Sequence, residues 1–403
     1  MTVATITAGR TPARRLPWAL GACHLVARGG AFVQPMLVLY LTQEQQMYPT
    51  AAGAVVAAVG IGDFGSQLLG GWLGDRIGRR KTMLLGFLGT AIALAALGSA
   101  AVTPVIWATA VGYGLAAGLF RPAGSAAVAD LPPDERVRAY SLLYWAANLG
   151  YAVAATVSGV LASRGYGLLF WLNAVAMLLA ALIVVAAVPE THPGTSRQRR
   201  ALLPALRADR LMRTMTLIHA GCFTLLMQAF ATLPLLMTAQ QFSSATYGGV
   251  LALNGFAIVV LQPLAVAVLA NRDRATVLAA SMLLAGVGGG LAAVSQGIVG
   301  YAVAVLVLSL GQIGLAVQFG ATFAALAPPE LRSGYLGVAS SAWSLGAVLG
   351  PVLGTALLER AGRTWLGLVA FAAGILLFLA QQAVAGHLRE RQDGQYTEKG
   401  INQ

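Results

Sequence analysis

Apolar runs of about 20 residues follow one another along almost the whole chain, separated by short polar gaps. Hydrophobic residues make up 58% of the 403 residues, while charged residues make up only 10%. A run of this length can cross a bilayer as a helix, because a helix satisfies its own backbone hydrogen bonds. The sequence therefore predicts an all-α membrane protein.

The apolar runs predict twelve membrane-spanning helices in two six-helix bundles. We expect the helices at residues 17–41, 50–73, 82–101, 104–127, 138–162, 166–188, 213–239, 246–269, 276–296, 298–324, 335–358 and 364–386. The longest polar gap follows the sixth run and predicts a linker. The expected parts are an N-terminal tail at 1–16, a bundle at 17–188, the linker at 189–212, a second bundle at 213–386 and a C-terminal tail at 387–403.

The two predicted bundles resemble each other in sequence. A shift of 196 residues places Pro-Pro-Asp-Glu-Arg at 132–136 on Pro-Pro-Glu-Leu-Arg at 328–332. A shift of 199 residues pairs Cys23 with Cys222. Two pseudo-symmetric bundles of this kind are what a secondary transporter needs in order to rock around a central site.

The positive charge of the chain lies mostly in the short gaps between apolar runs. The formal net charge is +12, but it is not spread over a soluble face as nucleic-acid binding would require. The positive-inside rule places most of the arginines on the cytoplasmic side if both termini are cytoplasmic. We therefore expect a multi-pass protein of a bacterial plasma (inner) membrane, with both tails in the cytoplasm and no nucleic-acid partner.

Residues 71–81 carry five charges between two apolar runs. They fit the pattern Gly-x-x-x-Asp-Arg-x-Gly-Arg-Arg, whose fixed positions are Gly71, Asp75, Arg76, Gly78, Arg79 and Arg80. This pattern resembles the signature of the major facilitator superfamily, found in the loop between helices 2 and 3. Within that family the chain resembles the twelve-helix drug:proton antiporter (multidrug efflux) branch. The resemblance implies the major facilitator fold and transport by alternating access.

By its position, this loop is expected to hold the cytoplasmic side shut. Asp75 can accept hydrogen bonds from the free amides that open the eleventh helix near Ser333 and Gly334, where the helix dipole also favours an anion. The family resemblance implies that Arg79 pairs with Asp130. Breaking these contacts would favour the inward-open state.

Two features depart from the antiporter pattern. The first is a series of small residues around a proline on the eleventh helix, formed by Gly346, Gly350, Pro351 and Gly354. Glycines permit close helix contact and a proline permits a bend, so we expect helix packing here. Drug exporters of the superfamily carry a similar element on helix 5. The second feature is Arg121, which follows the glycines of the fourth helix and fits a gate, a snorkelling anchor or a partner of an acid on the cytoplasmic side.

Asp63 is the one clearly intramembrane acid of the sequence. It lies 12 residues before Asp75, and the helical rise places it roughly 18 Å from the cytoplasmic edge. A carboxylate there is costly unless it is paired or protonated. Arg28 lies at the same expected depth and is the preferred partner, with His24 one turn nearer the cytoplasm. These three residues form either a proton-coupling site or a static ion pair that locks two helices together.

Polar and aromatic residues at mid-membrane depth are candidates for a substrate cavity. One face of the fifth helix carries four of them, Tyr140, Tyr144, Asn148 and Tyr151. Such a face suits an amphipathic or aromatic substrate. Candidates on other helices are Gln34, Gln67, Tyr113, Gln228, Asn254, Gln312 and Trp343. The alternative for all of them is helix packing with interhelical hydrogen bonds.

The sequence gives no support for catalysis or for a cofactor. A Gly-x-Gly-x-x-Gly pattern at 60–65 lies inside a predicted helix with no preceding strand, so it does not indicate a dinucleotide site. The four histidines are scattered and form no metal-ligand pattern. We therefore expect no enzyme activity, no cofactor and no metal site.

The function that fits these features best is secondary active transport. We expect proton-coupled export of a hydrophobic or amphipathic small molecule, such as a drug-like compound or natural product, by a monomer. Its partners would be this substrate, protons and the lipid bilayer. One alternative is an importer or uniporter of a metabolite such as a sugar or organic anion, with Arg28 and His24 binding the anionic group. Another is a membrane scaffold or sensor that transports nothing.

Overall fold

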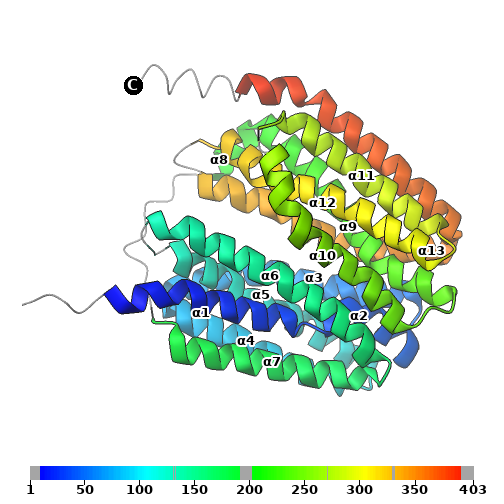
Figure 1. Cartoon of the computed structure of the whole chain (residues 1–403), viewed down its shortest axis with the longest axis horizontal. Coiled ribbons are helices and arrows are strands. Elements are labelled where there is room, and N and C mark those ends of the chain that lie inside the picture. The colour runs from blue at the N-terminus through cyan, green and yellow to red at the C-terminus, as the bar shows by residue number, and fades with distance from the viewer. Residues whose placement is uncertain are drawn as a thin grey trace, which may run out of the picture. The chain divides into compact units, whose positions relative to one another are not determined.

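The computed structural model of the chain describes residues 10–129, 131, 133–190, 202–269, 271–328 and 332–391. Its regular elements within these ranges are all helices (Figure 1). The prediction of an all-α protein is confirmed.

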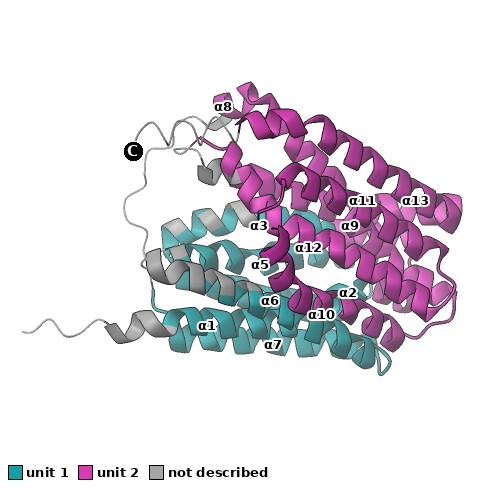
Figure 2. Ribbon diagram, turned by 45° about the horizontal axis from the view of Figure 1, so that its top comes forward, with its two compact units in different colours: residues 1–37, 58–196 teal, residues 38–57, 197–403 magenta. Residues whose placement is uncertain are grey.

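The chain forms two compact units (Figure 2). Unit 1 comprises Met1–Leu37 and Ala58–Ser196, and unit 2 comprises Val38–Ala57 and Arg197–Gln403. The helices of unit 1 are α1 (Arg10–Gly29), α4 (Arg79–Gly98), α5 (Thr103–Ala129), α6 (Pro133–Ala162) and α7 (Tyr166–Ala187). Two helices, α2 (Val33–Leu39) and α3 (Pro49–Ile77), run through the boundary between the units. Unit 2 therefore includes residues 38–57, which the sequence places in the first bundle.

Unit 2 contains the remaining helices. They are the π-helix η1 (Tyr40–Glu44) and the α-helices α8 (Leu202–Ala208), α9 (Arg210–Ala239), α10 (Ser244–Leu269), α11 (Arg274–Val294), α12 (Ile298–Leu326) and α13 (Arg332–Ala383). Its core is apolar and includes Met215, Leu278, Met282 and Phe323. Close van der Waals packing of such side chains holds these helices together within the unit, because lipid tails are as apolar as the core and supply no hydrophobic driving force between helices.

Ten helices of the described residues are long and apolar enough to cross a membrane. One of these stretches, in α13, contains a break at Gly362, which has φ of 79°. Glycine tolerates this left-handed conformation, so the break separates the two spans predicted at 335–358 and 364–386. The helix α3 covers the span predicted at 50–73. The exact count of twelve spans stays a prediction.

The first predicted span, 17–41, is interrupted in the structure. Helix α1 ends at Gly29, and α2 begins at Val33 after a turn in which the Phe32 amide donates to the Gly30 carbonyl at 2.8 Å. Glycine is a poor helix former, and a proline at position 35 cannot donate a backbone hydrogen bond. Together these residues explain why an apolar run long enough for one helix forms two.

The glycines predicted for packing on the eleventh helix lie against α9. A Cβ added at Gly350 would lie 2.7 Å from the Gln228 amide nitrogen and 2.7 Å from the Thr224 carbonyl oxygen. Added at Gly346 or Gly354, it would similarly meet α9 at Phe223 or Gln228. The absence of side chains therefore lets α9 and α13 approach closely.

Candidate functional site

Helices α3 and α5 of unit 1 pack closely through small residues. A Cβ at Gly62 would lie 2.7 Å from the Leu115 amide nitrogen, and one at Gly114 would overlap the Val59 carbonyl. Further along, Gly70 faces Leu119. Residue numbers rise together along this contact, so the two helices run in the same direction.

This contact brings Asp63 and Arg121 together as an ion pair. Nη2 of Arg121 donates to Oδ1 of Asp63. The Arg121 side chain is 31% exposed and that of Asp63 is 19% exposed, so the pair is largely enclosed by protein. Gly118 leaves room for the carboxylate, because a Cβ there would lie 2.8 Å from Oδ1 of Asp63.

The predicted pair of Asp63 with Arg28 is therefore not the pair that the structure contains. Arg121 lies one turn beyond Gly118 on α5, and its long side chain reaches back toward the carboxylate. The interpretation of Arg121 as an anchor or as a partner of an acid on the cytoplasmic side missed this contact. The register of α3 against α5 decides which arginine meets Asp63, and that register depends on tertiary packing.

Arg28 lies near this pair without joining it. Gly150 of α6 lets α1 approach, since a Cβ there would lie 2.8 Å from Cβ of Arg28. Asp63, Arg121 and the hydroxyls of Tyr113 and Tyr151 are within electrostatic range of the Arg28 guanidinium. The cluster in the described part of unit 1 thus combines two arginines, one carboxylate and two tyrosines.

His24 is held mainly by its own helix and by an aromatic neighbour. Its Nδ1 lies 3.0 Å from the Leu20 carbonyl oxygen, and its ring meets that of Phe120 edge to face at 5.4 Å. His219 of α9 repeats this arrangement in unit 2, with Nδ1 2.8 Å from the Met215 carbonyl oxygen. Its ring packs on Phe323 at 5.1 Å. This local geometry fits a packing role for both histidines.

The residues proposed for a substrate cavity in unit 1 have different surroundings. Tyr113 is buried, and Tyr151 and Asn148 are half-buried. Gln34 is exposed on α2. The side chains of Gln67, Tyr140 and Tyr144 lie outside the described residues. Tyr113 and Tyr151 both lie within electrostatic range of Arg28.

In unit 2, several of the proposed cavity residues make contacts between helices. The side-chain amide of Asn254 on α10 donates to Oγ of Ser309 and to Oε1 of Gln312, both at 2.9 Å. Gln228 is buried beneath Gly354. The Trp343 ring meets that of Phe223 at 5.2 Å. These contacts fit the alternative of helix packing.

The signature loop forms a tight turn between α3 and α4. Gly78 has φ of 99°, which favours glycine, and α4 begins at the next residue. The Arg80 amide donates to Oε1 of Glu190 at 3.0 Å, and the Arg76 guanidinium lies 5.0 Å from the centre of the Trp72 ring. The contact with Glu190, which follows α7, could not be predicted from the sequence.

The other gate residues of this loop are only partly described. Arg79 is buried at the start of α4. The surroundings of Gly71, the side chain of Asp75 and the whole of Asp130 lie outside the described residues. The contact of Asp75 with the eleventh helix and the pair of Arg79 with Asp130 therefore stay predictions.

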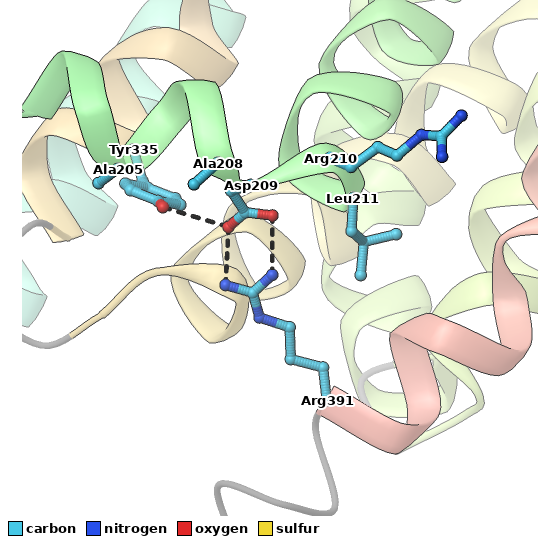
Figure 3. A pocket seen from close by; sticks show the side chains of 7 residues that line it. All are labelled: Ala205, Ala208, Asp209, Arg210, Leu211, Tyr335 and Arg391. Atoms are coloured by element: carbon cyan, nitrogen blue, oxygen red, sulfur yellow. Dashed lines mark hydrogen bonds and ion pairs between the residues drawn. The ribbon is translucent and has the colours of Figure 1, made fainter.

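A second charged cluster lies at the end of unit 2 where α9 begins (Figure 3). Asp209 caps α9 by accepting from the Met212 amide at 3.0 Å. Arg391 donates to both carboxylate oxygens of Asp209, at 2.8 and 2.7 Å, and the Tyr335 hydroxyl donates to Oδ2 at 3.1 Å. A shallow pocket of about 460 Å³ is lined by Asp209, Tyr335 and Arg391 together with Ala205, Ala208, Arg210 and Leu211.

Asp273 repeats this combination at the start of α11. It accepts from the Thr276 amide at 2.9 Å and receives two bonds from Arg389, at 2.9 and 2.8 Å. The C-terminal residues 385–391 therefore bind the N-termini of two helices, α9 through Arg391 and α11 through Arg389. An aspartate just before an apolar run is a recognisable capping signal, but nothing in the sequence indicated its arginine partner.

We expect acid to weaken both clusters. Burial raises the pKa of Asp209, but hydrogen bonds from Arg391 and the Met212 amide outweigh it and hold the pKa below its usual value. Hydrogen bonds from Arg389 hold the pKa of Asp273 well below the usual range. Because both folded-state pKa values lie below the unfolded value near 3.9, each pair stabilises the fold above about pH 4 and loses this effect as the pH falls further.

The measurement is thermal unfolding of the purified protein between pH 7 and pH 3. Asn also caps helices, so Asp209→Asn with Asp273→Asn removes the charges and keeps the caps. The double variant should be less stable than the wild type at pH 7, with about 1 kcal/mol of this loss at the Asp209–Arg391 pair, because solvent screens the partly exposed Arg391. It should also respond less to acid than the wild type. An identical acid response in both proteins would contradict the assignment.

Two compact helical units and an ion pair between two helices deep in one of them fit a helical membrane transporter. Residues 20–243 and residues 220–399 each match the family model of the Major Facilitator Superfamily. The chain belongs to this family of membrane transporters, as the signature loop predicted.

Relatives and solved structures agree with this assignment. The multidrug resistance protein MdtH of Aeromonas salmonicida is 29% identical over 368 residues, which cover 88% of this chain and 91% of that protein. The uncharacterized MFS-type transporter YttB of Bacillus subtilis is 26% identical over 83% of this chain and 86% of its own length. A POT family transporter in complex with 5-aminolevulinic acid has a TM-score of 0.80 at 15% identity, covering 93% of this chain and 97% of that one. That last likeness concerns the fold alone.

Proposed function

We propose that this transporter exports a hydrophobic or amphipathic small molecule in exchange for protons, by alternating access. The observation that carries the proposal is the ion pair of Asp63 and Arg121 between α3 and α5. Ionisable groups within membrane-spanning helices are costly and commonly mark proton or substrate pathways. The name of the relative MdtH, multidrug resistance protein, supports the direction and the kind of cargo.

The chemistry of the pair supplies a way to couple protons to movement. A proton that binds the Asp63 carboxylate removes the negative charge that Arg121 pairs with. Arg121 is then an uncompensated charge in a medium of low dielectric constant, which favours a different arrangement of α3 and α5. Loss of the proton on the other side of the membrane restores the pair. His24 and Arg28, close to Arg121, would modulate this exchange electrostatically.

The remaining roles extend this proposal. Tyr113, Asn148 and Tyr151 would contact the substrate from unit 1. The loop at 71–81 would close the cytoplasmic side through Asp75. The protein would work as a monomer in a bacterial plasma membrane, with both termini in the cytoplasm.

The test measures transport and proton movement in proteoliposomes with a pH-sensitive dye inside. Three fluorescent probes of different charge serve as substrates: ethidium, Nile red and 1-anilinonaphthalene-8-sulfonate. We expect at least one probe to be moved uphill by a pH gradient. Asp63→Asn should slow this uphill movement at least about tenfold while probe exchange without a gradient continues, because only the proton step is lost.

Asp209→Asn is the matched control, because it makes the same chemical change outside the spans and should leave uphill transport intact. Unchanged uphill movement in Asp63→Asn would refute proton coupling at this residue. A wild type that moves none of the three probes against or along a gradient would refute export of this class of molecule.

A further inference from the structure

Residues 38–57 pack on α9 and α13 within unit 2. A Cβ added at Gly53 would lie 2.7 Å from the Pro351 carbonyl oxygen of α13. The side-chain amide of Gln43 donates to Oγ1 of Thr238 on α9 at 3.4 Å. Within this segment, Ala52 and Val55 are 0% exposed. The segment is thus held by both close packing and polar contacts.

Glu359 of α13 binds the N-terminus of α3. Its Oε2 accepts from the Thr50 amide at 2.7 Å and from the Thr50 hydroxyl at 2.6 Å. Helix α3 begins at Pro49, and the preceding Tyr48 has no side chain that can cap a helix. The carboxylate of Glu359 therefore acts as the cap of α3 from another helix, where the positive end of the helix dipole favours an anion.

Glu359 is poorly placed for its own helix. It lies in the last turn before the break at Gly362. An acid in the last turn is disfavoured by the negative end of the helix dipole. The Thr50 amide and hydroxyl both donate to the ionised carboxylate of Glu359, so its partner is the N-terminus of α3 and not its own helix. The positive charge of the neighbouring Arg360 also favours the ionised carboxylate of Glu359. A carboxylate at this position therefore serves the contact with α3.

We propose that Glu359 and Thr50 form a clasp that opens and closes in each transport cycle and releases residues 38–57 from α13. The proposal rests on alternating access in the proposed function, but on neither proton coupling nor the identity of the substrate. The predicted contact of Asp75 with the amides opening the eleventh helix has the same chemistry with the roles of the two helices exchanged. Alternating access requires a closure at each end of the helices, and Glu359 supplies the one opposite Asp75.

The experiment measures how often the clasp opens. Ala52→Cys places a thiol on a buried position of the segment, and its reaction with a water-soluble maleimide requires the segment to separate. The two natural cysteines, Cys23 and Cys222, are buried. Tyr48→Cys is the control, because this position is 78% exposed and reacts whether the clasp is open or closed. Labelling is followed on the full chain in proteoliposomes without substrate or gradient.

We expect Glu359→Gln to speed the labelling of Ala52→Cys roughly tenfold, because the neutral amide loses the charge that strengthens both hydrogen bonds from Thr50. Thr50→Val should speed it less, because the Thr50 amide still donates. Thr50→Ser should label at the wild-type rate. The Tyr48→Cys rate should be the same in all backgrounds, and an unchanged unfolding temperature shows that the variants are folded.

Equal labelling of Ala52→Cys with and without Glu359→Gln would overturn the proposal, as would a segment that stays unlabelled in every variant. Repeating the labelling of Ala52→Cys in proteins that also carry Asp63→Asn distinguishes a failure of the clasp from a failure of the proposed proton coupling. If proton coupling at Asp63 is wrong, the labelling differences remain. If the clasp is wrong, they vanish whatever Asp63 does.

Discussion

Removing both members of the Asp63–Arg121 pair should destabilise the protein less than removing either member alone. Asp63→Asn leaves the Arg121 guanidinium without its partner, and Arg121→Gln leaves the carboxylate of Asp63 alone. Breaking a buried pair costs 3–5 kcal/mol, and partial exposure of these side chains reduces this to about 2–3 kcal/mol for each single variant. The double variant contains no unpaired charge of this pair and should lose about 1 kcal/mol or less. Thermal unfolding of the purified variants gives the comparison.

The same cycle distinguishes the observed pair from the one predicted from the sequence. Asp63→Asn combined with Arg28→Gln should show little coupling, because the structure does not join these side chains. If that combination rescued stability while Asp63→Asn with Arg121→Gln gave additive losses, Arg28 would be the functional partner. Additive losses of stability for Asp63→Asn and Arg121→Gln would contradict the ion pair, because groups in contact are expected to show coupling.

The sequence predicts the helices well because the hydropathy of a segment indicates directly whether lipid or water surrounds it. The expected span 213–239 lies within α9, and the span 298–324 lies within α12. The interruption after Gly29 is harder to predict, since an apolar run continues through it. Its cause is the conformational preference of two glycines and a proline, which a count of apolar residues ignores.

The candidate site was predicted less completely than the fold. Helical rise alone identifies Asp63 as an acid deep within a span, so its unusual environment can be inferred from the sequence. Its partner depends on how α3 and α5 are aligned, and Gly114 and Gly118 set that alignment through contacts far apart in sequence. The tail arginines Arg389 and Arg391 were missed for the same reason, because their partners belong to other helices.

The internal repeat extends to these packing contacts. Gly150 of α6 lies against Gly29 of α1, and Gly350 of α13 lies against Gln228 of α9. In each predicted six-helix bundle, a glycine on the fifth helix therefore lets that helix approach the first helix of the same bundle. The eleventh helix carries more glycines than the fifth, but both halves use the same means of close contact. Glycine position is therefore a better guide to packing here than the number of glycines.

The same reasoning gives opposite expectations for two neighbouring glycines of α5. A Cβ at Gly114 would overlap the Val59 carbonyl of α3, whereas a Cβ at Gly112 would meet nothing within 4 Å. Gly112→Ala should raise the free energy of unfolding by up to about 1 kcal/mol, because alanine is the better helix former. Gly114→Ala should lower it by about 2–3 kcal/mol, because overpacking exceeds that gain and pushes apart the helices that carry Asp63 and Arg121.

Thermal unfolding of both variants measures this difference, and uphill transport of the probes measures its consequence. Gly112→Ala should keep wild-type transport, while Gly114→Ala should lose it together with stability. Equal unfolding temperatures for the two variants would show that α3 and α5 do not meet at Gly114. The pairing of Asp63 with Arg121 would then lose its structural basis, because this close approach is what brings the carboxylate within reach of the arginine.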